Sequence, residues 1–294
     1  MEREIWRRVV AALRSIPPTR PRNAVYTDRQ IAAVFLWAAL HDRPIDWACK
    51  RKNWPMQAWR RALPDQSTMS RRLRHSEMHD LLWSLLQRVQ RHFGAGEVLV
   101  ADGKPLELSE HTGDPDAARG RGAGRYAKGY KLHLMLDSSV RAIRGYQVHP
   151  LNVSEPTTMA AILDCSRTEV ACGSRLLGDR IFDSNTLHAA AANRGCQLIA
   201  PRKRPYTSTG HRRHHPHRYE SIRLTEGVDR CIWDQVLSPQ RVQIERFFGA
   251  MSAAGGGLFA LPPWVRRLHR VRLWVAAKLV INATQIALRK EIAA

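Results

Sequence analysis

The chain has 294 residues, of which 44% are hydrophobic and 25% are charged, enough for one large and one smaller globular domain. Its charge is unusual, because 47 Lys and Arg against 26 Asp and Glu give a formal net charge of +21. Such an excess favours a polyanionic partner such as nucleic acid, although an Arg-rich, GC-rich genome would produce the same bias.

Nothing in the sequence indicates a membrane span or secretion. The longest uninterrupted apolar run, Ile31 to Leu40, is about half of what a membrane-spanning helix requires. Charges occur throughout the first 22 residues, so no apolar core of a signal peptide is present. The five cysteines form no C-x-x-C pair, which argues against a disulfide framework or a zinc site. We therefore expect a cytoplasmic protein with no membrane partner.

Residues 1–93 are predicted to be helical. Thr27 and Gln30 form a capping box before an apolar helix that ends near Leu40. Further helices are predicted over 45–52, from Pro55, after the cap residue Asp65, and over the amphipathic segment 78–93.

The pattern changes after the Gly94-Ala-Gly96 break. Short apolar or alternating runs predict strands over 97–101, 129–137, 142–149, 176–177 and 197–200, with a glycine-rich loop over 113–124. Helices are predicted over 154–165 and 185–193. Three successive strands followed by alternating helices and strands imply an α/β fold with a mixed sheet covered by helices.

The last third begins with a basic, His-rich segment, residues 201–230, that lacks periodicity and predicts a long loop or a small insertion. Helices follow over 234–251 and 263–290, with glycines between them. We therefore expect an N-terminal all-α domain at 1–93, a central domain at 94–252 with a basic insertion at about 201–234, and a C-terminal helical segment at 253–294.

Three acidic residues occupy positions that suit a catalytic site. Asp102 and Asp179 each end an apolar run, and Glu245 lies on a late helix one turn after Arg241. Singly, each has a structural explanation, as a turn residue or a surface ion pair. Together, three carboxylates in a basic protein suit phosphodiester transfer, in which two divalent cations about 3.5–4 Å apart activate the attacking oxygen and stabilise the leaving oxygen.

Four segments resemble the insertion-sequence transposases of the DDE type, in particular the broad bacterial family with a Tyr-x2-Arg-x3-Glu-x6-Lys signature. They are Val100-Ala-Asp102-Gly-Lys104-Pro, Lys128-Gly-Tyr130-Lys131-Leu-His133, Gly178-Asp179-Arg-Ile-Phe-Asp183-Ser and Arg241-Val-Gln-Ile-Glu245-Arg-Phe-Phe. The resemblance covers about residues 64 to 252 and depends on the ordered set of motifs.

The resemblance implies an RNase H-like catalytic core in which Asp102, Asp179 and Glu245 bind two Mg²⁺ ions, with Mn²⁺ as a substitute. It implies that Arg241 contacts transposon-end DNA. Water would attack one phosphodiester at each element end, and the freed 3′ hydroxyl would then attack target DNA. Double-stranded DNA, as transposon ends and as target, is the implied partner, a homodimer the implied active form, and the bacterial nucleoid the implied location.

The sequence departs from the family pattern at three places. Ser238 stands where the signature Tyr is expected, Ser252 stands where the Lys is expected, and Ile181-Phe182 replaces Gly-Tyr. The first two positions contact DNA phosphates in the family. An alternative is therefore a decayed or non-catalytic DNA-binding protein with the same fold.

Several other residues are candidates for DNA contact, each with a plainer explanation. Arg71, Arg72 and Arg74 could form a DNA-facing helix surface or a solvated charged face, and Lys128 and Lys131 could meet phosphates. Trp233 could stack on a flipped base or belong to the core. The histidines at 211, 214, 215 and 217 suggest zinc, but their basic surroundings favour a DNA-facing segment.

Overall fold

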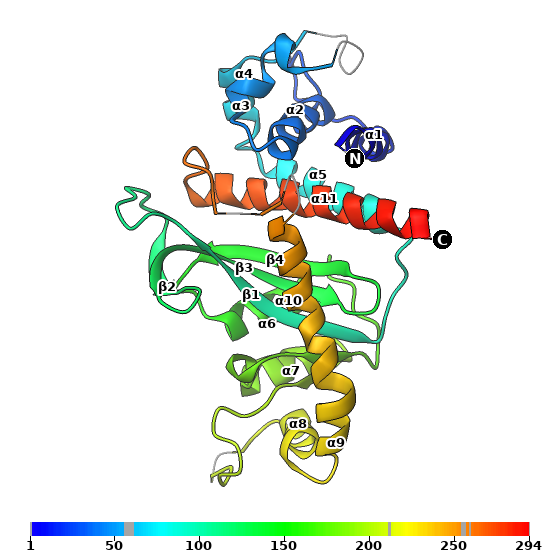
Figure 1. The fold of residues 1–294 in the computed structure, drawn as a ribbon, viewed down its shortest axis with the longest axis vertical. Coiled ribbons are helices and arrows are strands. Elements are labelled where there is room, and N and C mark those ends of the chain that lie inside the picture. The colour runs from blue at the N-terminus through cyan, green and yellow to red at the C-terminus, as the bar shows by residue number, and fades with distance from the viewer. Residues whose placement is uncertain (1, 56–61, 211–212, 254–256, 259, 294) are drawn as a thin grey trace. The chain divides into compact units, whose positions relative to one another are not determined.

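The computed structural model describes residues 2–55, 62–210, 213–253, 257–258 and 260–293 (Figure 1). The chain divides into two compact units. Unit 1 comprises Met1–His92 with Met251–Ala294, and unit 2 comprises Phe93–Ala250. The C-terminal segment therefore shares a unit with the N-terminal helices, whereas the sequence pattern had separated the two.

Unit 1 is helical, as predicted. Its helices are α1 (Glu2–Arg14), α2 (Asp28–Leu40), α3 (Ile45–Ala48), the 3₁₀ turn η1 (Arg51–Asn53), α4 (Gln66–Arg72), α5 (Ser76–Gln90) and α11 (Leu268–Ala293). Both hydrogen bonds of the Thr27–Gln30 capping box are present at the start of α2, and Asp65 caps α4. The predicted 45–52 helix is divided into α3 and η1. The helix predicted after Pro55 falls mostly on residues outside the described ranges.

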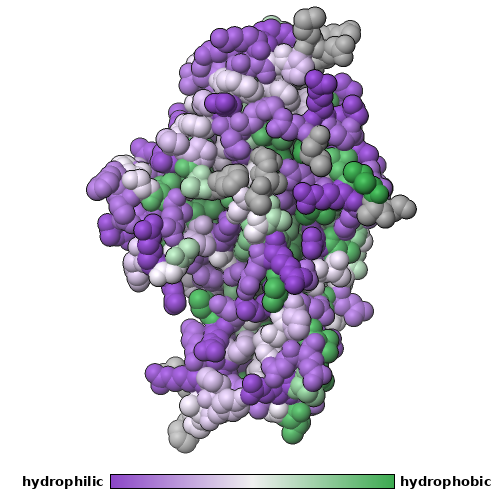
Figure 2. Space-filling model, viewed as in Figure 1, coloured by the Kyte–Doolittle hydropathy of each residue, from purple (hydrophilic) through white to green (hydrophobic). Residues whose placement is uncertain are grey.

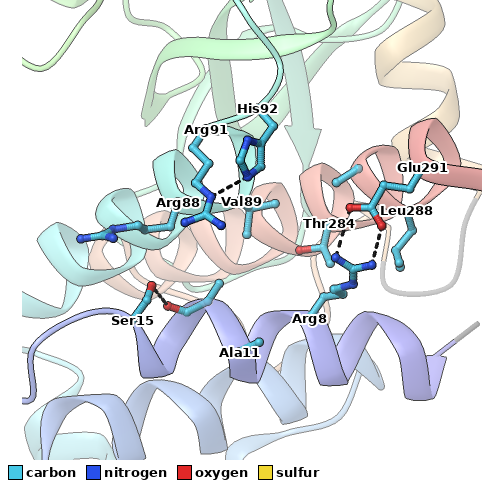
Figure 3. Close-up of a pocket in the computed structure, with 12 residues that line it drawn as sticks. Arg8, Ala11, Ser15, Arg88, Val89, Arg91, His92, Thr284, Leu288 and Glu291 are labelled. Atoms are coloured by element: carbon cyan, nitrogen blue, oxygen red, sulfur yellow. Dashed lines mark hydrogen bonds and ion pairs between the residues drawn. The ribbon is translucent and has the colours of Figure 1, made fainter. Parts of the chain in front are cut away.

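The helix α11 is the central element of unit 1, and it packs against α1, α2 and α5. By length and composition Leu268–Ile292 could cross a membrane, but 83% of its most apolar window is buried within the protein, as expected for a core helix. A pocket of about 250 Å³ lies between α1, α5 and α11 (Figure 3). Arg88 and Arg91 line it, and so does Arg8, which is paired with Glu291.

Unit 2 contains one six-stranded mixed sheet. The strands are β1 (Val98–Glu107), β2 (Ala118–Arg121), β3 (Tyr126–Asp137), β4 (Ala142–Pro150), β5 (Arg175–Leu177) and β6 (Gln197–Ile199). The order is β2-β3-β1-β5-β6, with β4 also paired to β3. The β1–β3, β2–β3 and β3–β4 pairs are antiparallel, whereas β1–β5 and β5–β6 are parallel. This arrangement is the predicted RNase H-like fold.

Helices cover both faces of the sheet. Leu99 and Ala101 of β1 belong to a buried cluster with residues of α6 (Glu155–Asp164) and α7 (Asn185–Asn193). Because side chains alternate along a strand, Asp102 and Lys104 point to the opposite face. There, Lys104 Nζ lies 5.6 Å from the centre of the Phe248 ring of α10 (Ser238–Ala253). The sheet thus directs Asp102 towards the face that α10 covers.

Three sequence predictions in unit 2 need correction. The first strand does not end at Ala101 but continues to Glu107, because β3 pairs with it along its whole length. The predicted 113–124 loop contains β2, and the predicted 201–230 loop contains α8 (Pro216–Glu226). The late helix begins earlier than predicted, with α9 (Arg230–Ile232) and the π-helical turn η3 (Trp233–Leu237) continuing into α10.

Candidate active site

Asp102 lies on β1, and Asp179 follows the end of β5, the parallel strand beside β1. Val100 of β1 pairs with Leu177 of β5, an offset of 77 residues (177 − 100 = 77). Asp179 follows Asp102 by the same offset (179 − 102 = 77) and lies two residues beyond the end of β5. Since adjacent strands run about 4.8 Å apart, the register brings these two acidic residues together where β5 leaves β1.

Each of the two carboxylates is oriented by a backbone N–H group. Gly103 N donates to Asp102 Oδ1 at 2.7 Å, and Ile181 N donates to Asp179 Oδ1 at 2.8 Å. The second bond caps the 3₁₀ turn η2 (Arg180–Phe182). Both bonds leave the second carboxylate oxygen available to another ligand.

The chain beyond Asp179 is anchored by a buried ion pair. Arg218 of α8 donates to both carboxylate oxygens of Asp183, at 2.7 and 2.8 Å. Burial favours a higher pKa for Asp183, but the hydrogen bonds from Arg218 and the nearby His188 ring, whose Nε2 lies 3.6 Å from Asp183 Oδ1, outweigh it and lower the pKa to about 2. The helix α8, missed from sequence, therefore stabilises the loop that carries Asp179.

The electrostatic environment of Asp102 disfavours its charged form. Its pKa is raised to about 6, mainly by burial and also by the carboxylates of Glu155 and Asp179, while the Gly103 N–H and Arg241 act in the opposite direction. Clustered carboxylates of this kind are stabilised by a nearby cation, and hard divalent cations prefer oxygen ligands. Asp102 and Asp179 thus have the chemistry of a divalent-cation site.

Glu245 is connected to the surroundings of Asp102 by its ion pair with Arg241. Both residues lie on α10, with Arg241 Nη2 3.7 Å from Glu245 Oε1. The Arg241 guanidinium acts on Asp102, whereas the Glu245 side chain is 54% exposed. Among the described residues, no three His, Cys, Asp or Glu side chains are grouped closely enough to hold a metal ion. The role of Glu245 as third ligand remains a prediction.

Glu155 was not predicted from the sequence to belong to the site. It opens α6, and among the charged residues that influence Asp102 it has the largest effect. Its place in the first turn of a predicted helix is one indirect indication, since the helix dipole stabilises an acidic residue there. That explanation concerns the stability of the helix and gives no indication that Glu155 lies near Asp102.

The residues predicted to contact DNA differ in how accessible their side chains are. Arg71 and Arg74 are exposed at the end of α4. Lys128 Nζ donates to the Thr112 carbonyl at 2.9 Å and remains partly accessible. His214 contacts Arg218 and Asn185, and His211 lies outside the described residues.

Three of these DNA-contact predictions are not supported by the positions found. Arg72 is buried, and its guanidinium donates to the Asp28 carboxylate at 2.6 Å. This ion pair links α4 to α2. Lys131 is buried in an ion pair with Glu155. Trp233 is 8% exposed, so its ring belongs to the packed interior of unit 2.

The mixed sheet and its flanking helices define an RNase H-like domain, and comparisons with known proteins agree. A family model described as a transposase DDE domain matches residues 94–261, more than half of the chain. The chain therefore belongs to the DDE transposase family, whose members generally use divalent metal ions.

Solved structures support the fold. The cryo-EM structure of a piggyBac transposase synaptic complex with hairpin DNA is similar with a TM-score of 0.51 and 9% identity, covering 99% of this chain and 73% of that chain. At this identity the likeness concerns the fold alone. The comparison with curated proteins found no match.

Proposed function

We propose that this protein cleaves phosphodiesters at the ends of a mobile DNA element and joins the freed 3′ ends to target DNA. The observation that carries the proposal is that Asp102 and Asp179 each lie two residues beyond Val100 and Leu177, the last paired residues of β1 and β5. Family membership supports the same reaction class.

In this proposal Asp102, Asp179 and Glu245 hold two Mg²⁺ ions, for which Mn²⁺ can substitute. When bound, divalent cations supply Lewis acidity to the attacking and leaving oxygens of a phosphodiester. The chain itself orients Asp102 and Asp179 through the N–H groups of Gly103 and Ile181. Glu245 has to leave its contact with Arg241 to join them, and phosphate is the natural new partner of that guanidinium.

Double-stranded DNA is the proposed substrate, as element ends and as target. The net charge of +21 suits it, and Figure 2 shows hydrophilic side chains over most of the face in view. Arg71, Arg74, Lys128 and Arg241 are the exposed or partly exposed members of the predicted DNA-contact set. Pairing of two element ends requires two active sites, so we propose a homodimer in the active complex.

The test uses duplexes taken from the two DNA flanks of the gene, end-labelled and incubated with the protein, a target plasmid and Mg²⁺. We expect cut ends and joined products that both disappear in Asp102→Asn and Asp179→Asn. Cleavage that persists in both variants would contradict the proposal. Binding should weaken steeply with added salt, because phosphate contacts release counterions.

A non-catalytic DNA-binding protein of the same fold is the second candidate. The Arg241–Glu245 ion pair favours it, together with Ser238 and Ser252 at the two signature positions where Tyr and Lys are expected. The same assay separates the two functions. DNA binding with neither cleavage nor joining, in Mg²⁺ and in Mn²⁺, would support this candidate.

A further inference from the structure

A buried ion pair lies directly behind the strand that carries Asp102. Lys131 Nζ of β3 donates to Glu155 Oε1 at 2.6 Å, and the two side chains are only 8% and 12% exposed. Lys131 and Glu155 occupy the α6 face of the sheet, since Met135, on the same side of β3 as Lys131, belongs to the α6–α7 cluster.

Gly103 allows this pair to approach the backbone beside Asp102. A Cβ atom on Gly103 would lie 2.9 Å from Glu155 Oε2 and 3.0 Å from Lys131 Cδ, closer than ordinary contact permits. The N–H group of the same Gly103 donates to Asp102 Oδ1. One residue therefore separates the ion pair from the proposed cation ligand.

The charge of this pair acts on Asp102. Glu155 Oε2 would lie 2.9 Å from a Cβ on Gly103, and the Gly103 N–H group binds Asp102 Oδ1, so the negative charge of Glu155 lies close to the Asp102 carboxylate. His133 lies opposite Gly103 in the β1–β3 register, and burial lowers its pKa to about 3, so it is uncharged at neutral pH. Lys131 is thus the cation in contact with Glu155, and it offsets part of that carboxylate's charge.

We propose that Glu155 is a positioning and charge-setting residue of the active site: its carboxylate strengthens cation binding at Asp102, and Lys131 moderates that effect from within the protein. The proposal rests on the proposed function. It assigns Lys131 to the interior of the site and not to DNA.

The test is direct binding of Mn²⁺ to the full-length protein without DNA, followed by calorimetry, with Glu155→Gln and Lys131→Gln. Glu155→Gln removes a negative charge but retains a hydrogen-bonding partner for Lys131, and should weaken Mn²⁺ binding about 10- to 100-fold. Lys131→Gln leaves the Glu155 charge uncompensated and should tighten binding. The double variant should behave like Glu155→Gln, because Lys131 acts through Glu155.

The opposite signs distinguish this role from a purely structural one. If both single variants weaken binding, or neither changes it, the proposal is wrong. Should Glu155→Gln fail to fold, as judged by thermal unfolding, Lys131→Gln decides alone, since tighter binding supports the proposal and unchanged or weaker binding overturns it. Asp102→Asn serves as the reference: if it binds Mn²⁺ as the unaltered protein does, the proposed function itself fails.

Discussion

Lys278 in unit 1 and Asp102 in unit 2 are both charged residues withdrawn from water, but their surroundings differ. Lys278 is fully buried in α11 and donates to the Ala39 carbonyl at 2.6 Å and to Asp42, with the Trp274 ring centre 4.9 Å away. Asp102 is partly buried, and the carboxylates of Glu155 and Asp179 lie among its neighbours.

The difference separates a structural charge from a functional one. Burial lowers the pKa of Lys278, but Asp42 and a carbonyl stabilise its charge, so the fold itself satisfies it. Around Asp102 the fold brings together the like charges of Glu155 and Asp179, which the Gly103 N–H and Arg241 offset only in part, so that its pKa stays raised. Titratable groups whose pKa is shifted by burial and by neighbouring like charges are typical of functional sites.

The largest expected effect concerns Asp102→Asn. Loss of this carboxylate should reduce DNA cleavage by about 1,000-fold, since cation-based stabilisation of a transition state is worth several kcal/mol. The thermal midpoint of the cation-free protein should stay the same or rise, because an unfavourable charge is removed. Cleavage gels and thermal unfolding measure the two quantities. A large loss of stability in Asp102→Asn would mean that Asp102, like Lys278, has a structural role.

A second prediction concerns Asp183, a buried charge that has a full partner. Asp183→Asn should cost about 3 kcal/mol of unfolding free energy near neutral pH, because the partly buried Arg218 loses its bidentate acceptor. The folded pKa of about 2 lies below the ordinary value, so this stabilisation is present above about pH 4 and is lost as the pH falls towards 2.

Denaturant unfolding of the Asp183→Asn variant and the unaltered protein, at about pH 5 and about pH 3, checks this prediction. The difference between the two proteins should shrink at the lower pH. An equal difference in unfolding free energy at both pH values would mean that the charge of Asp183 does not contribute to its pairing with Arg218.

The ion pair of Lys278 gives a third prediction. Asp42→Asn should lower the unfolding free energy by about 2 kcal/mol, which is less than for a fully buried pair because Asp42 is 41% exposed. Lys278→Met should change the unfolding free energy by less than about 1 kcal/mol, because it removes the buried charge itself. Unfolding free energies of the two variants decide it. Neither should alter cleavage by the folded protein, and a specific loss of cleavage in Lys278→Met would contradict the structural assignment.

The smallest effect is expected for an exposed pair. Lys50 contacts Asp46 one turn earlier, with side chains 53% and 47% exposed. Lys50→Ala should change the unfolding free energy by no more than about 0.5 kcal/mol, because water and salt screen such pairs. A cost comparable to that of Asp42→Asn would show that pairing, and not burial, sets the scale of these effects.

Local signals in the sequence predicted several elements well. The helix α2 follows from Thr27, Gln30 and the apolar run after them, because a capping box is a contact within four residues. The helix α7 has the predicted bounds, Asn185–Asn193. Asp102 and Asp179 were identified because acidic residues that follow apolar runs are visible without the fold.

Long-range contacts account for the errors. The strand β1 continues past Asp102 because β3 pairs with it, and no local pattern encodes that partner. The helix α8 is polar and lacks apolar periodicity, and contacts with distant residues hold it, such as Arg218 with Asp183 and Ser221 with the Ala200 backbone. Arg72 and Lys131 looked like surface cations until their acidic partners were known.

The sequence by itself determined the basic charge, the capped helices, the order of strands and helices apart from β2 and α8, and the choice of Asp102 and Asp179 as candidates. Only the tertiary structure decided that Glu155 stands beside Asp102, that Lys131 points inward, and that Lys278 is satisfied by Asp42. The physical reason is that caps and periodicity act between near neighbours in the chain, whereas burial and Coulomb interactions depend on distances in space, which the folded chain alone defines.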